Sequence, residues 1–207
     1  MPPRPCRGKH AAARGAGSTG NFDVHFALRM PLMVWVEVTM NSSPKPPHGL
    51  PEIIETFGDI EAFITRDSNG LSGLSPEFEK LHIVNFKYCP TLDTESKPPK
   101  IKTIRCHRLL VPTFVSVFDL LILLGLIEHI HSIDGCFDFR AKRSGSGLST
   151  HCWGIAIDIN AATNRPGTRG DMDAEIIEVF KMAGFIWGGD WKGKMRDPMH
   201  FQFCSGY

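Results

Sequence analysis

The cysteines of this 207-residue chain lack the spacing of a zinc ribbon or a redox pair. All six are scattered and none forms a CxxC motif, so we expect small buried side chains rather than a disulfide framework. An excess of charge of one sign is also missing, because 23 basic side chains are matched by 22 acidic ones and the formal net charge is +1. This balance excludes a global field that attracts nucleic acid or an anionic membrane.

Long uninterrupted apolar runs are missing as well. The most apolar stretch, Leu109 to Ile127, is broken by Pro112 and Asp119, whereas a transmembrane helix needs about 20 consecutive apolar residues. We therefore predict a buried core helix over residues 115–131 and no membrane span. The basic N-terminus is not followed directly by a long apolar segment, as a secretory signal requires. We expect a cytoplasmic protein until it is released or exported by another route.

Apolar residues make up 42% of the chain and include 14 Phe. This is enough to form one hydrophobic core that is stable without disulfide bonds. A Pro-rich spacer, Asn41 to Gly49, separates a basic segment rich in Pro, Gly and Ala from the rest. We predict a poorly ordered leader over residues 1–48 and one compact, monomeric domain over residues 49–207.

Hydrophobic spacing indicates both helices and strands in that domain. It favours a short amphipathic helix with a break at Gly58 and a second helix that starts near Asp171 or Asp173 and ends at Gly184. Alternation predicts strands over residues 81–89 and 101–110, in "CFDFR" (136–140) and at the end of the chain. The fold class we predict is α+β, with a central antiparallel sheet that carries the functional site on one face and helices on the other.

The stretch "STHCWGIAIDIN", residues 149–160, combines a histidine, a glycine and an aspartate in a strand-like pattern. Alternation from Ile155 onward predicts a strand whose isoleucines share one face while Asp158 lies on the other. A bend at Gly154 would return the ring of His151 to the side of Asp158. Cys152 is turned away by the same alternation, so we expect no ligand there.

A second histidine of the same kind lies near the end of the chain. In "HFQF", alternation directs Phe201 and Phe203 into the core and His200 to the opposite face. If the two strands are adjacent, two imidazoles and one carboxylate meet at one point. Such a set is typical of catalytic zinc, with the fourth tetrahedral position left for water.

Two further residues suit the chemistry of such a site. Asp197 lies three residues before His200, across a Pro198 turn, and is a candidate general base. A simpler role for Asp197 is to cap that turn. Arg140, at the end of the predicted strand "CFDFR", is the candidate that stabilises an oxyanion, although a salt bridge to a loop carboxylate is an alternative.

The pattern S-x-H-x-x-G-x-A-x-D, followed about forty residues later by D-x-M-H-F, resembles a known enzyme family. These are the zinc D-alanyl-D-alanine carboxypeptidases and L-alanyl-D-glutamate endopeptidases, which cut peptidoglycan stem peptides and are related to the Hedgehog-type zinc fold. The resemblance covers residues 49–203 and is strongest toward the C-terminus. The roles that it implies are Zn²⁺ binding by His151, Asp158 and His200, base catalysis by Asp197, contact with substrate or oxyanion by Arg140, and contact with substrate by Ser149.

One position departs from the family pattern, and two other functions stay open. Many relatives have Glu two residues after the last histidine, whereas this chain has Gln202. A catalytically inactive zinc-bearing module that binds cell wall or protein is the alternative function. A structural zinc site would need a fourth ligand, for which Cys204 is the only nearby candidate. The sequence does not distinguish D-Ala-D-Ala from L-Ala-D-Glu as the bond that is cut.

Overall fold

A computed structural model of the chain describes residues 23–27, 35–39, 43–66, 72–89, 103–143 and 146–207. The α-helices are α1 (Gly49–Phe57), α2 (Pro76–His82), α3 (Val111–Leu123) and α4 (Ala174–Met182). The strands are β1 (Asp23–Ala27), β2 (Trp35–Thr39), β3 (Ile64–Arg66), β4 (Ser72–Leu74), β5 (Ile83–Phe86), β6 (Ile104–His107), β7 (Ile133–Gly135), β8 (Ala156–Ile159), β9 (Ile186–Trp187) and β10 (His200–Gln202). Short 3₁₀ turns are η1 (Ile60–Phe63), η2 (Arg108–Leu110), η3 (Ile127–His129), η4 (Thr150–Trp153), η5 (Gly188–Asp190) and η6 (Gly193–Met195).

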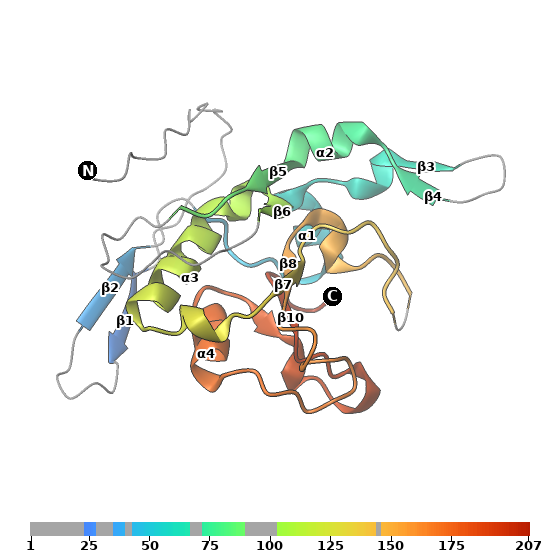
Figure 1. The fold of residues 1–207 in the computed structure, drawn as a ribbon. Coiled ribbons are helices and arrows are strands. Elements are labelled where there is room, and N and C mark those ends of the chain that lie inside the picture. The colour runs from blue at the N-terminus through green and yellow to red at the C-terminus, as the bar shows by residue number, and fades with distance from the viewer. Residues whose placement is uncertain (1–22, 28–34, 40–42, 67–71, 90–102, 144–145) are drawn as a thin grey trace.

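The central sheet is antiparallel, with strand order β7-β8-β10-β9. It lies in the middle of the molecule, with α4 beside it and α3 next to α4 (Figure 1). The rings of Phe180 on α4 and Phe201 on β10 stack with their centroids 4.5 Å apart, and both side chains are fully buried. The mixed α and β architecture predicted from the sequence is therefore confirmed, as is the direction of Phe201 into the core.

The helices follow their local sequence signals. Helix α1 ends at Gly58, whose backbone adopts φ 95°. This conformation is strained for any residue that has a Cβ atom. The Asp173 carboxylate accepts a hydrogen bond from Glu175 N at the start of α4, as the N-cap pattern predicts. Helix α3 is the predicted buried core helix, but it spans Val111–Leu123 rather than residues 115–131, because Pro112 is compatible with the first helical turn and Gly125, with φ 71°, follows the last one. None of the helices in the described ranges is both long and apolar enough to cross a bilayer.

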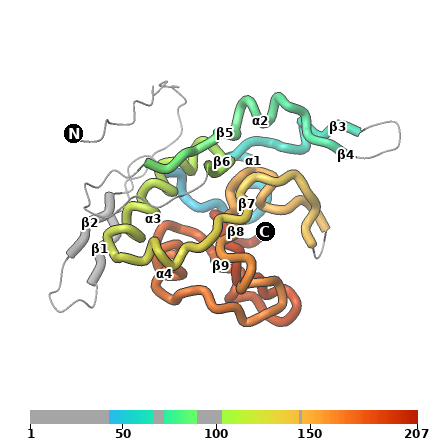
Figure 2. Tube along the Cα trace, in the orientation of Figure 1, coloured from blue at the N-terminus to red at the C-terminus, as the bar shows by residue number. Residues whose placement is uncertain are grey.

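Smaller two-stranded sheets surround the central one. Strands β5 and β6 pair beside it, and the β3–β4 hairpin projects away from the body of the molecule (Figures 1 and 2). Strands β1 and β2 pair as an antiparallel hairpin within residues 1–48, the segment predicted to be a poorly ordered leader. The boundary of the domain at residue 49 stays a prediction.

The spacer ahead of α1 packs against helix α3 and the C-terminal segment. The Thr113 hydroxyl donates to the buried Ser43 Oγ at 2.9 Å, and Ser205 N donates to Pro47 O at 2.9 Å. The ring of His48 also contacts Ser205, with 2.9 Å between His48 Nδ1 and Ser205 Oγ. Residues 43–48 of the spacer are therefore held by contacts with the rest of the chain.

The prediction of a strand over "CFDFR" is wrong. The strand in this region, β7, comes earlier, at Ile133–Gly135. The backbone of the following segment bonds to η4 and to the residue that caps it: Asp138 N donates to His151 O at 3.1 Å, and Ser149 N donates to Arg140 O at 3.0 Å. Arg140 therefore lies in an irregular segment whose path is set by η4. The polar loop predicted around residues 91–100 lies outside the described residues.

Candidate metal centre

Strands β8 and β10 bring an aspartate and a histidine directly opposite each other. In their antiparallel register His200 pairs with Asp158, and Phe201 pairs with Ile157. Residues paired in this way project their side chains from the same face of a sheet. His200 and Asp158 consequently share the face opposite to the fully buried Phe201 and Ile157.

His151 reaches the same place from the turn η4. Ser149 caps this turn and accepts a hydrogen bond from His151 N at 3.4 Å. Gly154 ends the turn with φ 66°, and a Cβ at that position would lie 2.8 Å from His107 N. Glycine is therefore required both for the left-handed backbone and for the close approach to β6. The tight turn lets the chain enter β8 with His151 beside Asp158.

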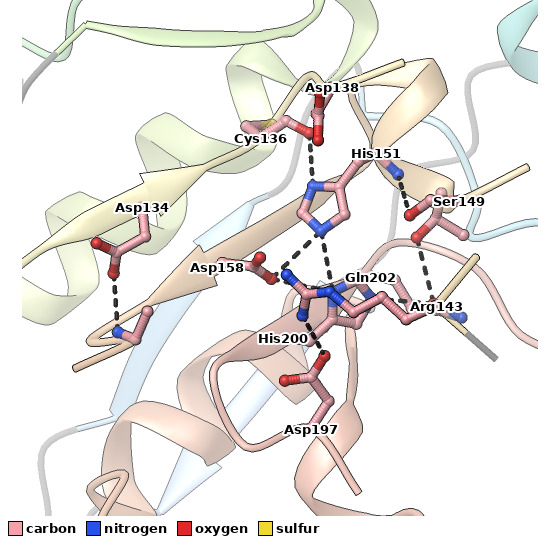
Figure 3. A network of polar contacts seen from close by, with 12 residues as sticks. Asp134, Cys136, Asp138, Arg143, Ser149, His151, Asp158, Asp197, His200 and Gln202 are labelled. Carbon is pink, nitrogen blue, oxygen red and sulfur yellow. Dashed lines mark hydrogen bonds and ion pairs between the residues drawn. The ribbon is translucent and has the colours of Figure 1, made fainter. Parts of the chain in front are cut away.

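The three side chains form a compact buried triangle (Figure 3). His151 Nε2 lies 3.3 Å from Asp158 Oδ1, and His200 Nδ1 lies 3.1 Å from the same oxygen. The two ring nitrogens are 3.2 Å apart. Ligands at zinc bond lengths of about 2.0–2.1 Å in tetrahedral geometry are separated by about 3.3 Å. The spacing of this triangle matches such a site to within a few tenths of an ångström.

Hydrogen bonds on the outer side of each ring fix which nitrogen faces the triangle. His151 Nδ1 lies 2.8 Å from Cys136 O, and His200 Nε2 lies 3.1 Å from Gln202 Oε1. A carbonyl oxygen only accepts, so each neutral ring places its proton on the outer nitrogen and its lone pair on the inner one. The Gln202 amide is itself oriented, because its Nε2 donates to Cys204 O at 3.3 Å.

The inner atoms are consequently three acceptors with no donor among them. Burial raises the pKa of Asp158, but proton donation and positive charge at the inner atoms of His151 and His200 outweigh burial and hold this pKa below the usual range of aspartate, and a cation bound in the same place acts in the same direction. The carboxylate is therefore ionised at neutral pH. Two lone pairs and a negative charge that converge in a buried space are stabilised by a cation. The residues present fit a divalent metal such as zinc.

Asp197 lies next to this triangle, on the turn that leads into β10. Its Oδ2 lies 3.7 Å from Arg143 Nη1, whereas its buried Oδ1 has no hydrogen-bond partner within the described part of the chain. Burial raises the pKa of Asp197, and the negative charge of Asp158 adds to this effect, while His200 and Arg143 oppose it. A buried carboxylate oxygen without a partner is normally costly, which makes Oδ1 a candidate to receive a proton.

Two arginines line the cleft above the triangle, and the structure gives them different partners. Arg140 Nε is paired with Asp138 Oδ2 at 3.1 Å, the salt bridge that the sequence left as an alternative. Arg143 extends toward Asp197 and the triangle (Figure 3). Of these two arginines, Arg143 is the one paired with Asp197, although the sequence pattern favoured Arg140. In the sequence, Arg143 is marked only by being a basic residue in the Gly/Ser-rich loop before Ser149.

The cleft itself has a volume of about 850 Å³. Its walls include Ser149, Asp197, His200 and Gln202, and Trp191 contributes an indole ring whose centroid is 5.4 Å from that of His200. Cys152 does not point into it: the thiol bonds to the backbone of Arg140. Burial raises the pKa of Cys204 to about 12, and among the described residues its sulfur does not join the group of ligand atoms formed by His151, Asp158 and His200.

The sequence of this region matches a known family. Residues 142–203 match the family model of D-alanyl-D-alanine carboxypeptidase. The segment contains the three residues of the triangle and Asp197, and the match confirms the resemblance carried by the two motifs. It supports a peptidase connected with peptidoglycan. No solved structure matches the chain at a significant level.

Proposed function

We propose that the protein is a zinc-dependent peptidase that hydrolyses peptidoglycan stem peptides, at a D-Ala-D-Ala or an L-Ala-D-Glu bond. The observation that carries this proposal is the convergence of three acceptor atoms beside a buried carboxylate oxygen that has no partner within the described residues. The family match over residues 142–203 supports the peptidase class and the peptidoglycan substrate.

In this proposal His151 Nε2, Asp158 Oδ1 and His200 Nδ1 would hold Zn²⁺. Bound there, zinc supplies Lewis acidity, which polarises a carbonyl oxygen and acidifies water. Cys136 O and Gln202 Oε1 keep the two rings in the tautomers that such binding needs.

Asp197 is the general base. Its Oδ1 takes a proton from water while the water oxygen bonds to the peptide carbon. The same proton then passes to the leaving nitrogen as the C–N bond breaks, so the products are a carboxylate and an amine. The raised pKa of Asp197 brings its basicity closer to that of the groups with which it exchanges the proton.

Arg143 has two roles in this mechanism. Its guanidinium pairs with Asp197 Oδ2 and so helps to fix the carboxylate, while Oδ1 has no partner within the described residues. Its positive charge also stabilises the oxyanion that develops on the carbonyl. Ser149 and Arg140 line the same cleft and are proposed to contact the substrate rather than the reacting atoms.

The alternative is a zinc-bearing module that binds cell wall or another protein without turnover. Such a module has no need for a buried carboxylate without a partner at the edge of its metal site, because that group destabilises the fold. The position of Asp197 Oδ1 therefore favours the enzyme.

Product analysis tests this proposal. The purified zinc-loaded protein is incubated with peptides that end in D-Ala-D-Ala and with whole sacculi, and free D-alanine and new amino termini are measured. Release of D-alanine identifies a carboxypeptidase, and new amino termini identify an endopeptidase. Binding to sacculi without either product would establish the alternative.

Variants assign the roles. Asp197→Asn is expected to keep stoichiometric zinc and lose about 10²- to 10⁴-fold in turnover. The control is Asp190→Asn, because Asp190 is a carboxylate of the same cleft that is already paired with Lys181.

His200→Gln is expected to lose zinc. Arg143→Gln is expected to reduce kcat more than Arg140→Gln does, and equal effects would remove the distinction between the two arginines.

A further inference from the structure

Cationic side chains outnumber acidic ones in the lining of the cleft. The cations come from two separate segments, one just before η4 and the other around η6, and the acids are Asp190 and Asp197. The five cations are Arg140, Lys142, Arg143, Lys192 and Lys194. Since the whole chain carries a net charge of only +1, this cleft is a local concentration of positive charge.

Both acids are already neutralised by partners. Asp190 Oδ2 lies 2.9 Å from Lys181 Nζ, which is not among the residues that line the cleft. Asp197 Oδ2 lies 3.7 Å from Arg143. Neither acid is therefore available to compensate the remaining cations.

The cations differ in how far their charge is satisfied. Arg140 is paired with Asp138, and the ammonium of Lys142 lies 3.5 Å from the centre of the Tyr207 ring, a contact that leaves its charge uncompensated. Lys192 and Lys194 are exposed, and in the parts of the chain that the structure describes neither forms an ion pair within 4.0 Å. Lys142, Lys192 and Lys194 thus present positive charge to whatever enters the cleft.

We propose that this cleft selects acidic peptides, with at least two free carboxylates near the scissile bond, and that Lys192 and Lys194 bind one of them. The inference rests on the proposed function and names its substrate class. A cleft lined by positive charges attracts and orients anionic ligands, so it binds them more tightly than neutral ligands of the same shape. Lys142, from the other segment, is placed to bind the second carboxylate.

Binding to a protein that does not turn over tests this selectivity directly. Zinc-loaded Asp197→Asn protein is titrated with a short peptide that carries a D-Glu side chain and a C-terminal acid. The comparison peptides replace D-Glu by D-Gln, the acid by an amide, or both. Each carboxylate removed is expected to raise Kd about fivefold, the size of a partly exposed ion pair, and added salt should reduce the difference.

A double variant separates the lysines from the metal, which also attracts carboxylates. In Lys192→Gln/Lys194→Gln, made in the same background, Kd should no longer respond to one of the two carboxylates. Lys45→Gln/Lys80→Gln removes the same charge from exposed positions that do not line the cleft, and should leave the discrimination intact. The proposal is overturned if Kd ignores both carboxylates in the parent, or if the cleft double variant discriminates as the parent does.

The outcomes also separate this proposal from the proposed function. Cleavage of neutral and acidic peptides with the same kcat/KM by the wild-type protein would leave the peptidase in place and remove the charge selectivity. Carboxylate-dependent binding without cleavage by the wild-type protein would retain the selectivity and favour the binding module.

Discussion

Gln202 Oε1 lies 3.1 Å from His200 Nε2, and the two residues are neighbours on the same face of β10. Thr150 Oγ1 donates to the same oxygen at 3.4 Å. A neutral amide here takes the place of the acid expected from the family pattern, and it still supplies the acceptor that fixes the ring of His200.

Removing this acceptor should weaken metal binding. We expect Gln202→Leu to raise the Kd for zinc about 10- to 100-fold, because the His200 ring loses the partner that sets its tautomer. Gln202→Glu retains the acceptor with a negative charge and should bind zinc at least as tightly as the wild type. Competition with a chelator measures the Kd, and the ¹⁵N shifts of His200 report the tautomer. Unchanged affinity in Gln202→Leu would show that the contact has no positioning role.

The position of Asp197 depends on a close approach by Gly188. Asp197 N donates to Gly188 O at 2.9 Å, and a Cβ at position 188 would lie 2.5 Å from Asp197 O. We expect Gly188→Ala to displace Asp197 and lower kcat by at least about 10²-fold with zinc still bound. Gly135→Ala is the matched control, since its Cβ meets nothing within 4 Å. Full activity in Gly188→Ala would contradict the proposed role of Asp197 as base.

Replacing two glycines that both have a left-handed backbone distinguishes the cost of backbone strain from the cost of a steric clash. Gly154 has φ 66° and Gly125 has φ 71°, but only Gly154 is close to another backbone atom, His107 N. Gly125→Ala should reduce the free energy of unfolding by about 1 kcal/mol through strain alone. Gly154→Ala should reduce it by about 3 kcal/mol or more, because the new methyl group also pushes β6 away from η4. Urea denaturation of the two variants checks the difference, and equal losses would mean that the contact relaxes freely.

His107 should make the fold sensitive to acid. Burial, together with the nearby His82, lowers the pKa of His107 to about 3, and its ring accepts from Leu109 N and contacts Phe57 O. In the unfolded chain His107 becomes protonated below about pH 6.5, whereas in the folded protein it stays neutral down to about pH 3. The free energy of unfolding is therefore expected to fall as the pH falls through this window.

The variant His107→Asn tests this source of acid sensitivity. Asparagine retains an acceptor for Leu109 N but does not titrate. We expect it to be less stable than the wild type near about pH 7, yet to lose less stability between about pH 7 and about pH 5. Urea midpoints at both pH values measure the two losses. Parallel losses would show that His107 is not responsible.

Local periodicity was sufficient for the elements that carry the triangle. Alternation around Asp158 and His200 assigned each to the face opposite the core, and the glycine after His151 predicted the turn that returns its ring. Helix α4 likewise follows from its cap residues and apolar spacing. These features depend on contacts between residues that are close along the chain, so the sequence displays them directly.

Other features depend on contacts between distant segments. The path of residues 136–143 is set by backbone hydrogen bonds to η4 and to residues 147–149, which made "CFDFR" irregular, and Arg143 rather than Arg140 is the arginine paired with Asp197. The acceptor role of Gln202 and the packing of residues 43–48 on α3 and the C-terminal segment likewise arise only in the folded chain. Two strands with the right alternation establish which side chains share a face, because their period is two residues. Which loop closes over that face is decided by three-dimensional packing, since loops have no period from which their course can be predicted.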